Sequence, residues 1–444
     1  MFPLPLSVTA TACGQMDNET VKKLWNGFTL TLGQLKIIPC EELIFRVGQT
    51  ELPELPADKE YALRVDEKGI ALVGKDFGGL MRGFMVLLMK IEYRQKAFSI
   101  RPVDTQSHYR IGNRMIHICV FPENDLYFIK KLIRLSALCQ YTHIVIEFWG
   151  TLRYDCLKEL AWPHAFTKDQ ARELIQECRD LGIKPIPMFN MFGHATASRE
   201  RYGKHVVLDQ NPTLQDLFTP DGWAWDVTNP ETYELLRKVR LELYDLFGDT
   251  EYFHIGCDEA YYYMHSEELL RQVPDFLRRL TNDVVAEGKK PMLWMDMMLE
   301  KKDFPSGYYA FANGMGQTLL DSLAKESVMV DWQYNVDTAP VQSSVYLKDQ
   351  GHELIVAPWL RRPNYTACID TVAEHSLSGL MLTTWHTLKD QMYSILGCAQ
   401  TCGADTFVWS VNRVGEETAA MLRRISFEGN TYEDAGWSKL QIEI

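Results

Sequence analysis

Two acidic residues, Asp258 and Glu259, stand side by side in the segment YFHIGCDEAYYYMH, residues 252–265. They follow an apolar run that is typical of a buried strand and that ends in Gly256 and Cys257. Neighbours along a strand point to opposite faces, so two adjacent carboxylates need an explanation. Glycosidic bonds are usually cleaved by two carboxylates about 5 Å or more apart, on opposite sides of the bond. Sequence neighbours do not straddle a sugar in this way, but they could divide the work if Glu259 protonates the leaving oxygen while Asp258 holds a nucleophilic group of the substrate.

Aromatic and polar side chains follow other strand-like runs in the same position. Sugar rings stack on tryptophan through their apolar C–H faces, so a bowl of tryptophans suggests a carbohydrate pocket. Any one of these tryptophans, taken alone, fits equally well as a packing residue between strands and helices, and their shared position is what favours the sugar interpretation. The set comprises Glu147, Trp149, Asn190, His194, Trp294, Asp296, Trp332, Tyr334, Trp359 and Trp385.

The elements that must position these residues alternate between strand-like runs and helices from residue 114 onward. One predicted helix begins with a capping box of Thr167 and Gln170 and stops at Gly182, and another begins at Asn229–Pro230 and ends near Gly248. Eight runs separated by helices predict a (β/α)8 TIM barrel, whose active site lies at the C-terminal ends of the strands. The runs are RMIHICV, THIVIEFW, IKPIPMFNMFGHA, EYFHIGC, KPMLWMDM, VMVDWQYNV, HELIVAPWL and GLMLTTWHT.

A smaller α/β unit is predicted before the barrel. EYALRVDEKGIALVG alternates apolar and polar residues on either side of a turn at residues 66–69, which indicates a hairpin. Gly78 and Gly79 then open LMRGFMVLLMKI, where Leu80, Phe84, Leu87, Leu88 and Ile91 form one helical stripe. We therefore expect a small N-terminal α/β domain at residues 1–107 and a catalytic barrel at residues 108–444.

Charge and composition narrow the classes of partner. The formal net charge is -13 and 46% of the residues are hydrophobic. An acidic chain of this kind argues against a nucleic-acid or anionic membrane surface, and a neutral or cationic small ligand fits better. No apolar run approaches the roughly 18 residues that a membrane-spanning helix needs, so we expect a soluble protein. A homodimer through the barrel helices is compatible with the sequence, which does not decide the oligomeric state.

Ten cysteines are scattered through mostly apolar surroundings. Cys398 and Cys402 lie one helical turn apart, but no second Cys/His pair stands at zinc-site spacing, and we expect neither a metal nor another cofactor. The stretch MFPLPLSVTATACG lacks a basic region and is interrupted by prolines, so it is predicted to be a strand and not a secretion signal. Without a secretion signal, we expect the ten cysteines to be free thiols in a reducing compartment, and the expected location is the cytoplasm.

The motif HIGCDE resembles the His-x-Gly-Gly-Asp-Glu motif of glycoside hydrolase family 20, the β-N-acetylhexosaminidases, and HIGCDEAYYY is closer still to the family's hexosaminidase D-like branch. The similarity covers most of the chain. The first hundred residues resemble the family's small α/β domain. IPMFNMFGHA is similar to its third-strand stretch ending in Gly-His, LWMDMM to its fifth-strand Trp-x-Asp segment, and GLMLTTW to its last strand with the pocket tryptophan.

The resemblance implies an exo-acting enzyme that hydrolyses terminal β-linked GlcNAc or GalNAc. In the family's substrate-assisted mechanism the 2-acetamido oxygen attacks the anomeric carbon, and water opens the resulting oxazolinium-type intermediate with retention. Asp258 would orient the acetamido N–H, and Glu259 would act first as acid and then as base. Their proximity should raise one pKa, which favours a protonated Glu259 near neutral pH.

Further roles are implied less directly. Tyr334 is the candidate for the tyrosine that hydrogen-bonds the acetamido oxygen. The alternative is that this hydrogen-bonding group comes from the next strand, which is marked by Trp359. His194 and His254 are expected to orient neighbours and not to react. Arg114 stands where a hydroxyl-binding arginine is expected, although an arginine at the start of a strand also fits the bottom of the barrel. The substrate-binding set is Arg114, Glu147, His194, Trp294, Asp296, Trp332, Trp385 and Asp390.

The chain also departs from the family pattern. Cys257 replaces the second Gly of the motif, and we interpret it as a small apolar spacer and not as a nucleophile. Cys119 and Asn190 stand where better-known members carry Asp, and Thr387 stands where they place a Glu. Glu147 and Asp390 are candidates to replace these hydroxyl-binding acids, which leaves the choice between GlcNAc and GalNAc open.

Two other functions compete with this interpretation. A metal-dependent barrel hydrolase or isomerase could use His117, Glu147, His194 and Asp258 as ligands, although no tight spacing such as His-x-His supports it. A non-catalytic sugar-binding protein could keep the same scaffold, because a fold does not guarantee chemistry. Retention of both adjacent acids favours an enzyme.

Overall fold

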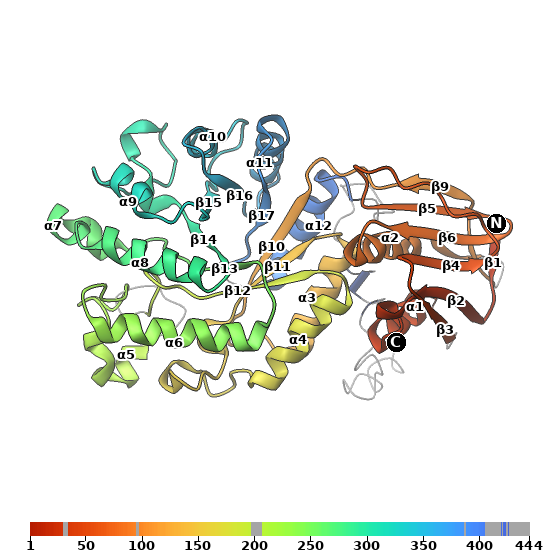
Figure 1. Ribbon diagram of the computed structural model, residues 1–444, viewed down its shortest axis with the longest axis horizontal. Helices are drawn as coiled ribbons and strands as arrows, with labels where there is room; N and C mark the ends of the chain where they lie inside the picture. Colours follow the sequence, from red (N-terminus) through yellow and green to blue (C-terminus); the bar gives the residue numbers. More distant parts are fainter. Residues whose placement is uncertain are drawn as a thin grey trace, which may run out of the picture.

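The computed structural model describes residues 1–29, 34–94, 97–196, 207–385 and 388–404, together with residues 419, 421, 422 and 425. Its larger part is a closed barrel of eight parallel strands in chain order, which confirms the predicted (β/α)8 architecture (Figure 1). Each of the eight predicted runs contains one strand. The strands are β10 (Asn113–Cys119), β11 (His143–Glu147), β12 (Lys184–Met188), β13 (Tyr252–His254), β14 (Lys290–Trp294), β15 (Val328–Trp332), β16 (Glu353–Ala357) and β17 (Gly379–Leu382).

Alternate residues of each strand point into the barrel, as the pleat requires. Nearer the N-terminal ends of the strands, the interior of the barrel is apolar and includes Met115, Val145, Ile186, Met292 and Val328. Polar and aromatic side chains replace these apolar ones toward the C-terminal ends of the strands, at His117, Glu147, His254 and Trp294. The candidate site therefore lies above a packed hydrophobic core.

Helices surround the barrel between successive strands (Figure 1). The longer ones are α3 (Leu126–Leu138), α4 (Lys168–Asp180), α6 (Pro230–Phe247), α8 (Val273–Ala286), α9 (Gly316–Ser322), α10 (Gln342–Asp349), α11 (Arg362–His375) and α12 (Met392–Thr401), with short α5 (Val207–Gln210) and α7 (Glu267–Leu270). The capping box of Thr167 and Gln170 is present at the start of α4. Asn229 caps α6, which ends before Gly248 as predicted. None of the described helices is long and apolar enough to cross a membrane.

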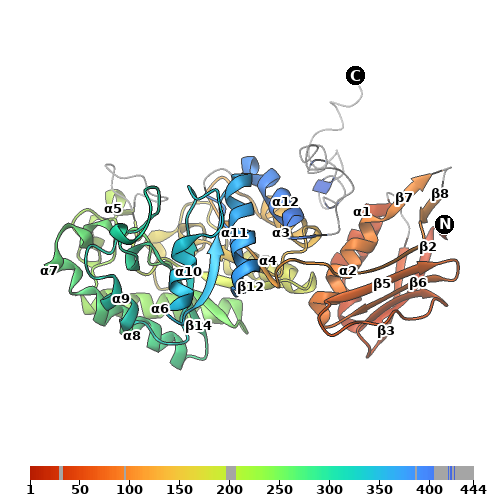
Figure 2. The same ribbon diagram turned by 90° about the horizontal axis from the view of Figure 1, so that it is seen from above.

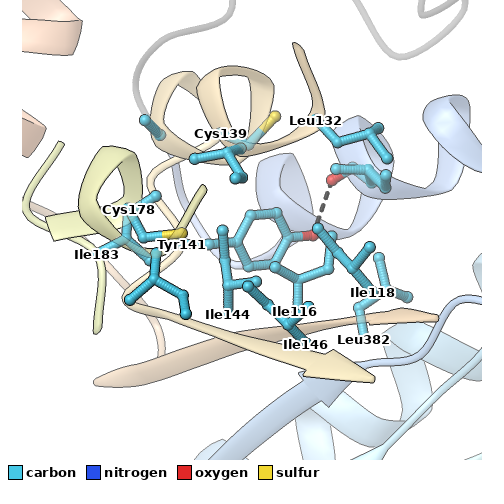
Figure 3. Packing of buried hydrophobic residues seen from close by; sticks show 14 of the residues in the cluster. Ile116, Ile118, Leu132, Cys139, Tyr141, Ile144, Ile146, Cys178, Ile183 and Leu382 are labelled. Atoms are coloured by element: carbon cyan, nitrogen blue, oxygen red, sulfur yellow. Dashed lines mark hydrogen bonds between the residues drawn. The ribbon is translucent and has the colours of Figure 1, made fainter. Parts of the chain in front are cut away.

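The outer face of the barrel packs against these helices around Tyr141, as Figure 3 shows. The ring of Tyr141 lies over Ile116 and Ile144, which belong to the outward faces of β10 and β11. Its hydroxyl donates a 2.8 Å hydrogen bond to the backbone oxygen of Ile395 in α12. A buried tyrosine needs such a partner for its hydroxyl, and here the bond connects the segment between α3 and β11 to helix α12.

The N-terminal residues form a separate α/β unit beside the barrel (Figure 2). Its main sheet has the order β3-β2-β4-β6-β5-β9, and a three-stranded sheet has the order β1-β8-β7. The strands are β1 (Phe2–Leu4), β2 (Ser7–Cys13), β3 (Gln34–Cys40), β4 (Ile44–Gly48), β5 (Tyr61–Asp66), β6 (Gly69–Gly74), β7 (Ile91–Arg94), β8 (Ala97–Ile100) and β9 (Val103–Gln106). The predicted hairpin is the β5–β6 pair, in which Asp66 lies opposite Gly69.

Helices α1 (Glu19–Thr29) and α2 (Phe77–Met89) lie between the main sheet and the barrel (Figure 2). Residues 79–89 of α2 are all buried, because the helix has the sheet on one side and barrel helix α3 on the other. The helix ends at Met89, so Ile91, which we predicted as part of its apolar stripe, instead begins strand β7. The predicted boundary at residue 107 falls between β9 and β10, and the division into two domains at that residue stays a prediction.

Candidate active site

Asp258 and Glu259 lie in a loop and not in a strand, because β13 ends four residues earlier at His254. The backbone of the loop enters the left-handed region repeatedly, with φ of 69° at Gly256, 81° at Cys257 and 50° at Glu259. Such values are uncommon for residues with a Cβ and cost free energy that the surrounding structure must offset. The loop removes the expected alternation and lets both carboxylates turn to the same side.

Both carboxylates reach the same imidazole. The Nε2 atom of His194 lies 3.3 Å from Oδ2 of Asp258 and 3.0 Å from Oε2 of Glu259. The loop after β12 brings His194 here by passing close to the Asp258 backbone: a Cβ on Gly193 would lie 1.8 Å from the Asp258 carbonyl oxygen, so only glycine fits. The adjacent acids are therefore arranged around one histidine.

The charges of this cluster shift its pKa values. Burial alone would lower the pKa of His194, but the neighbouring carboxylates, Asp258 first, raise it from 6.5 to about 10. Burial would likewise raise the pKa of Glu259, but the hydrogen bond to His194, the charge of His194 and the hydrogen bond from Tyr261 together outweigh burial and hold that pKa below 4.5. Our prediction of a raised Glu259 pKa is therefore wrong, because the sequence does not reveal the cation beside it.

Asp296 is the carboxyl whose pKa is raised. It is 1% exposed, and burial and the neighbouring Asp258 carboxylate raise its pKa well above 3.8. Its Oδ2 atom accepts a 2.8 Å hydrogen bond from the Glu259 backbone N–H, and its Oδ1 atom accepts one of 3.0 Å from the indole of Trp332. Asp296 thus binds the backbone of the loop that carries Asp258 and Glu259, and it orients Trp332, which belongs to an aromatic wall of the site.

Aromatic rings from β15, β16 and β17 form that wall. The indole Nε1 of Trp385 donates a 2.8 Å hydrogen bond to the hydroxyl of Tyr334, and the rings of Trp332 and Tyr334 are 5.1 Å apart. Trp359 packs 5.4 Å from Tyr334 on the other side. Tyr334 and Trp385 are half-buried, so they combine fixed positions with surface that a ligand can contact.

Three further residues of this region had escaped the sequence analysis. Tyr309 packs 4.3 Å from Trp332. Gln391 accepts hydrogen bonds at its Oε1 atom from the Trp359 indole at 2.8 Å and from the Trp385 backbone at 3.1 Å. Trp223 donates a 2.6 Å hydrogen bond to the Glu259 carbonyl. Trp223 and Tyr309 lie in loops and Gln391 ends the short 3-10 helix Leu388–Gln391, so none of the three follows a strand directly, and only the aromatic character of Trp223 and Tyr309 is a signal in the sequence.

A buried polar layer lies inside the barrel, next to Trp385. Oε2 of Glu147 is 3.1 Å from Nε2 of His117, and Oε1 of Glu147 accepts a 2.7 Å hydrogen bond from Asn190. Trp294 is fully buried, with its ring 4.5 Å from His254 and 5.9 Å from Trp385. Glu147 also has no exposed surface. The two predicted binding residues Glu147 and Trp294 are thus buried inside the barrel, and their part in sugar binding stays a prediction.

Arg114 does not belong to the site, which corrects its assignment to sugar binding. It is the second residue of β10, at the N-terminal end of the barrel, and is 1% exposed. Its guanidinium binds both carboxylate oxygens of Glu60 at 3.0 and 3.1 Å and several backbone carbonyls. The guanidinium therefore binds at the junction between the barrel and the N-terminal unit. A residue at the start of a barrel strand lies a full strand length from the rim, so Arg114 does not reach the candidate site.

The remaining predicted residues fall outside the cluster. Asp390 is exposed in the short 3-10 helix Leu388–Gln391, and its part in hydroxyl binding stays a prediction. Trp149 is buried under the rim. Thr387 lies outside the described residues. Cys257 is fully buried and burial raises its thiol pKa well above 9.0, which agrees with the interpretation of this residue as a spacer.

The four residues considered as metal ligands form two separate pairs. His117 contacts Glu147 at 3.1 Å, and His194 contacts Asp258 at 3.3 Å. Within the described part of the chain, no group of three or more His, Cys, Asp or Glu residues is arranged to hold a metal ion. The geometry instead brings two carboxylates, one imidazolium and an aromatic wall to a single rim.

Comparisons with known proteins match this part of the chain. The family model described as "Glycosyl hydrolase family 20, catalytic domain" matches residues 147–392, more than half of the chain. β-Hexosaminidase subunit A1 of Dictyostelium discoideum is 26% identical over 229 residues, which cover 47% of this chain and 41% of that protein. Lacto-N-biosidase of Bifidobacterium bifidum is 23% identical over 203 residues, 46% of this chain and 17% of that protein. The chain thus matches less than half the length of either relative.

Solved structures share the fold over nearly the whole chain. The Flavobacterium johnsoniae chitobiase superposes with a TM-score of 0.69 at 16% identity, covering 98% of this chain and 72% of that one. The β-N-acetylhexosaminidase of Streptomyces coelicolor gives a TM-score of 0.64 at 14% identity, covering 98% of this chain and 93% of that one. At these identities the likeness shows the fold alone: a barrel preceded by an α/β unit.

Proposed function

The chain belongs to glycosyl hydrolase family 20, and we propose that it is an exo-acting β-N-acetylhexosaminidase that removes terminal β-linked GlcNAc or GalNAc from glycans. The observation that carries the proposal is the convergence of Asp258 and Glu259 on His194 within the matched segment. Two acids on the same side suit a substrate that supplies its own nucleophile better than a bond attacked from opposite faces.

In the proposed reaction the acetamido oxygen of the substrate attacks the anomeric carbon as the glycosidic bond breaks. Asp258 accepts the acetamido N–H, which orients the amide and stabilises the positive charge that develops on it. Oδ1 of Asp258 is buried and has no hydrogen-bond partner among the residues that the structure describes, so it is available to accept this bond. Tyr334, fixed by Trp385, is the candidate donor to the acetamido oxygen.

Glu259 delivers the proton to the leaving oxygen and recovers one from the water that opens the intermediate. Because its pKa is lowered and that of His194 is raised to about 10, the proton of the pair resides on His194 before substrate binds. We propose that it shifts to Glu259 when the glycosidic oxygen approaches and water is excluded. The pair then acts as one acid with a single proton.

The domain assignment is part of the proposal. Residues 108–444 would form the catalytic unit, with every proposed reacting group carried by barrel loops, and residues 1–107 would cover the opposite end of the barrel. The ion pair of Arg114 with Glu60 supports a structural role for the N-terminal unit. A cytoplasmic location stays a prediction from the cysteine usage.

The proposal is tested by release of nitrophenol from the β-GlcNAc and β-GalNAc aryl glycosides. We expect wild type to cleave at least one of them and Glu259→Gln and Asp258→Asn to lose about a hundredfold or more in kcat. Glu268→Gln, which changes an exposed carboxylate on α7, is the matched control and should retain wild-type rates.

A thiazoline analogue of the intermediate separates the mechanism from the activity. Substrate-assisted cleavage predicts competitive inhibition by the analogue that weakens in Asp258→Asn. Cleavage of both sugars without inhibition would mean a glycosidase of another mechanism, and no cleavage of either sugar would contradict the proposed function.

A further inference from the structure

Trp223 contacts the catalytic loop from a segment that the proposed mechanism does not use. Its indole Nε1 donates a 2.6 Å hydrogen bond to the backbone carbonyl of Glu259. Glu259 has the left-handed φ of 50°, and its backbone N–H is bound to Asp296 at 2.8 Å. The peptide groups on both sides of this residue are thus held by side chains, one from each neighbouring loop, which offsets the cost of the conformation.

The same indole covers the histidine that binds both acids. The ring centroids of Trp223 and His194 are 4.6 Å apart. A cation within about 6 Å of a tryptophan ring is stabilised by the negative face of the ring. The carboxylates raise the pKa of His194 and so favour its imidazolium form, and the Trp223 ring, tilted by 53° against the imidazole, is close enough to stabilise that cation as well.

The backbone around Trp223 fixes its position relative to His194. The carbonyl of Trp223 accepts a 2.9 Å hydrogen bond from the N–H of Ala195, and the N–H of Trp225 donates one of 2.9 Å to the carbonyl of Phe192. Segment 223–225 is therefore hydrogen-bonded to the chain both before and after His194, at Phe192 and at Ala195. Asp221 secures the turn by accepting a 3.1 Å hydrogen bond from the Trp223 N–H.

Tyr261 extends this arrangement on the outer side. Its ring is stacked on Trp223 at 6.2 Å and 20°. Its pKa is raised by burial and by its hydrogen bond to the Glu259 carboxylate. Trp223 is thus the common neighbour of the two side chains that bind the Glu259 carboxylate.

From these contacts we infer that Trp223 is a positioning residue for the acid–base step, holding the Glu259 backbone in its left-handed conformation while its ring stabilises the protonated His194. The inference rests on the proposed function for its kinetic consequence. The effect on His194 follows from the geometry alone, whatever the substrate proves to be.

Two substitutions separate the two contacts. Trp223→Phe removes the N–H donor but keeps an aromatic ring near His194, so kcat should fall about tenfold while KM stays within about twofold. Trp223→Leu also removes the ring, so in addition the pKa of His194 should fall by about one unit. The alkaline limb of the kcat profile should shift to lower pH in Trp223→Leu and remain near its wild-type position in Trp223→Phe.

The pKa of His194 is read from imidazole carbon resonances in a pH titration, with the His194→Asn spectrum identifying its signal among the 11 histidines. Trp225→Phe is the matched control, because its indole lies in the same segment but donates to the Asn190 carbonyl at 2.8 Å. It should lower thermal stability without moving the His194 pKa.

The outcomes are distinct. Wild-type kcat in Trp223→Phe, an unchanged His194 pKa in Trp223→Leu, or an equal pKa change in Trp225→Phe would each overturn the inference. If Trp223→Leu does not fold, the tenfold loss of kcat at constant KM in Trp223→Phe decides. If wild type cleaves neither sugar, the proposed function fails, while the titration of His194 still tests the contact with Trp223.

Discussion

Replacement of His194 by Asn should destabilise the protein in a pH-dependent way. Raising a histidine pKa from 6.5 to about 10 corresponds to a net stabilisation of the imidazolium by about 5 kcal/mol, at about 1.4 kcal/mol per pKa unit, after the two carboxylates have offset the cost of burial. The side chain is 23% exposed, and solvent screening reduces this figure, so we expect a loss of about 2–3 kcal/mol at pH 6. The assay is urea unfolding of wild type and His194→Asn, extrapolated to water.

The sign of the pH dependence follows from linkage. Because the folded-state pKa of His194 is above its unfolded value, its stabilisation is fully present below pH 6.5 and is lost as pH rises toward about 10. The difference between wild type and His194→Asn should therefore shrink between pH 6 and pH 10. His352→Asn is the control: burial lowers the pKa of His352, so its effect should not shrink over this range. An equal loss of stability for His194→Asn at both pH values would refute the ion-pair reasoning.

Other substitutions test the surroundings of the catalytic pair. In Asp296→Asn the new amide N–H faces either the Glu259 backbone N–H or the Trp332 indole N–H, so one of these two hydrogen bonds is lost. The kcat in the aryl glycoside assay should therefore fall about a hundredfold, and wild-type rates would exclude a role of Asp296 in holding Glu259. Arg114→Met should lower the free energy of unfolding by about 2–3 kcal/mol in urea, since Glu60 keeps Arg82 as a partner but the backbone carbonyls of Gln140 and Ile111 lose a buried donor, and KM should not change; a raised KM would restore the sugar-binding role. Tyr334→Phe should lower kcat/KM about tenfold or more for the 2-acetamido substrate, and an unchanged value would direct attention to Trp359.

The strands and the principal helices could be predicted because their signals are local. Each barrel strand lay within a predicted apolar run, and the capping box at Thr167 and the cap at Asn229 marked helix starts that the structure has. A hydrogen bond between residues three apart depends little on the rest of the fold, so such signals survive in an isolated sequence. The prediction erred at Ile91, where the apolar pattern continues from a helix into a strand.

The candidate site was predictable only as a set of strand ends. Residues that follow parallel strands gather at one rim whatever their separation in sequence, and this rule located Asp258, Glu259, His194 and Asp296. The assignment of Arg114 to this rim was wrong, since the residue lies at the N-terminal end of β10, opposite the rim. The rule does not apply to Trp223, which lies in a loop, or to Gln391, which ends a short 3-10 helix, because neither residue directly follows a strand.

The acids, their adjacency and the barrel that carries them could be read from the sequence, because strand patterns and motif spacing are properties of neighbouring residues. The electrostatic environment of those acids depends on the tertiary structure. The pKa of His194 is raised and that of Glu259 is lowered because side chains from two loops, 65 positions apart in the chain, meet at 3.0 Å in a partly buried site. Electrostatic interaction depends on distance and burial in three dimensions, so the direction of the pKa shifts and the contacts of Trp223 could not be read from the order of residues.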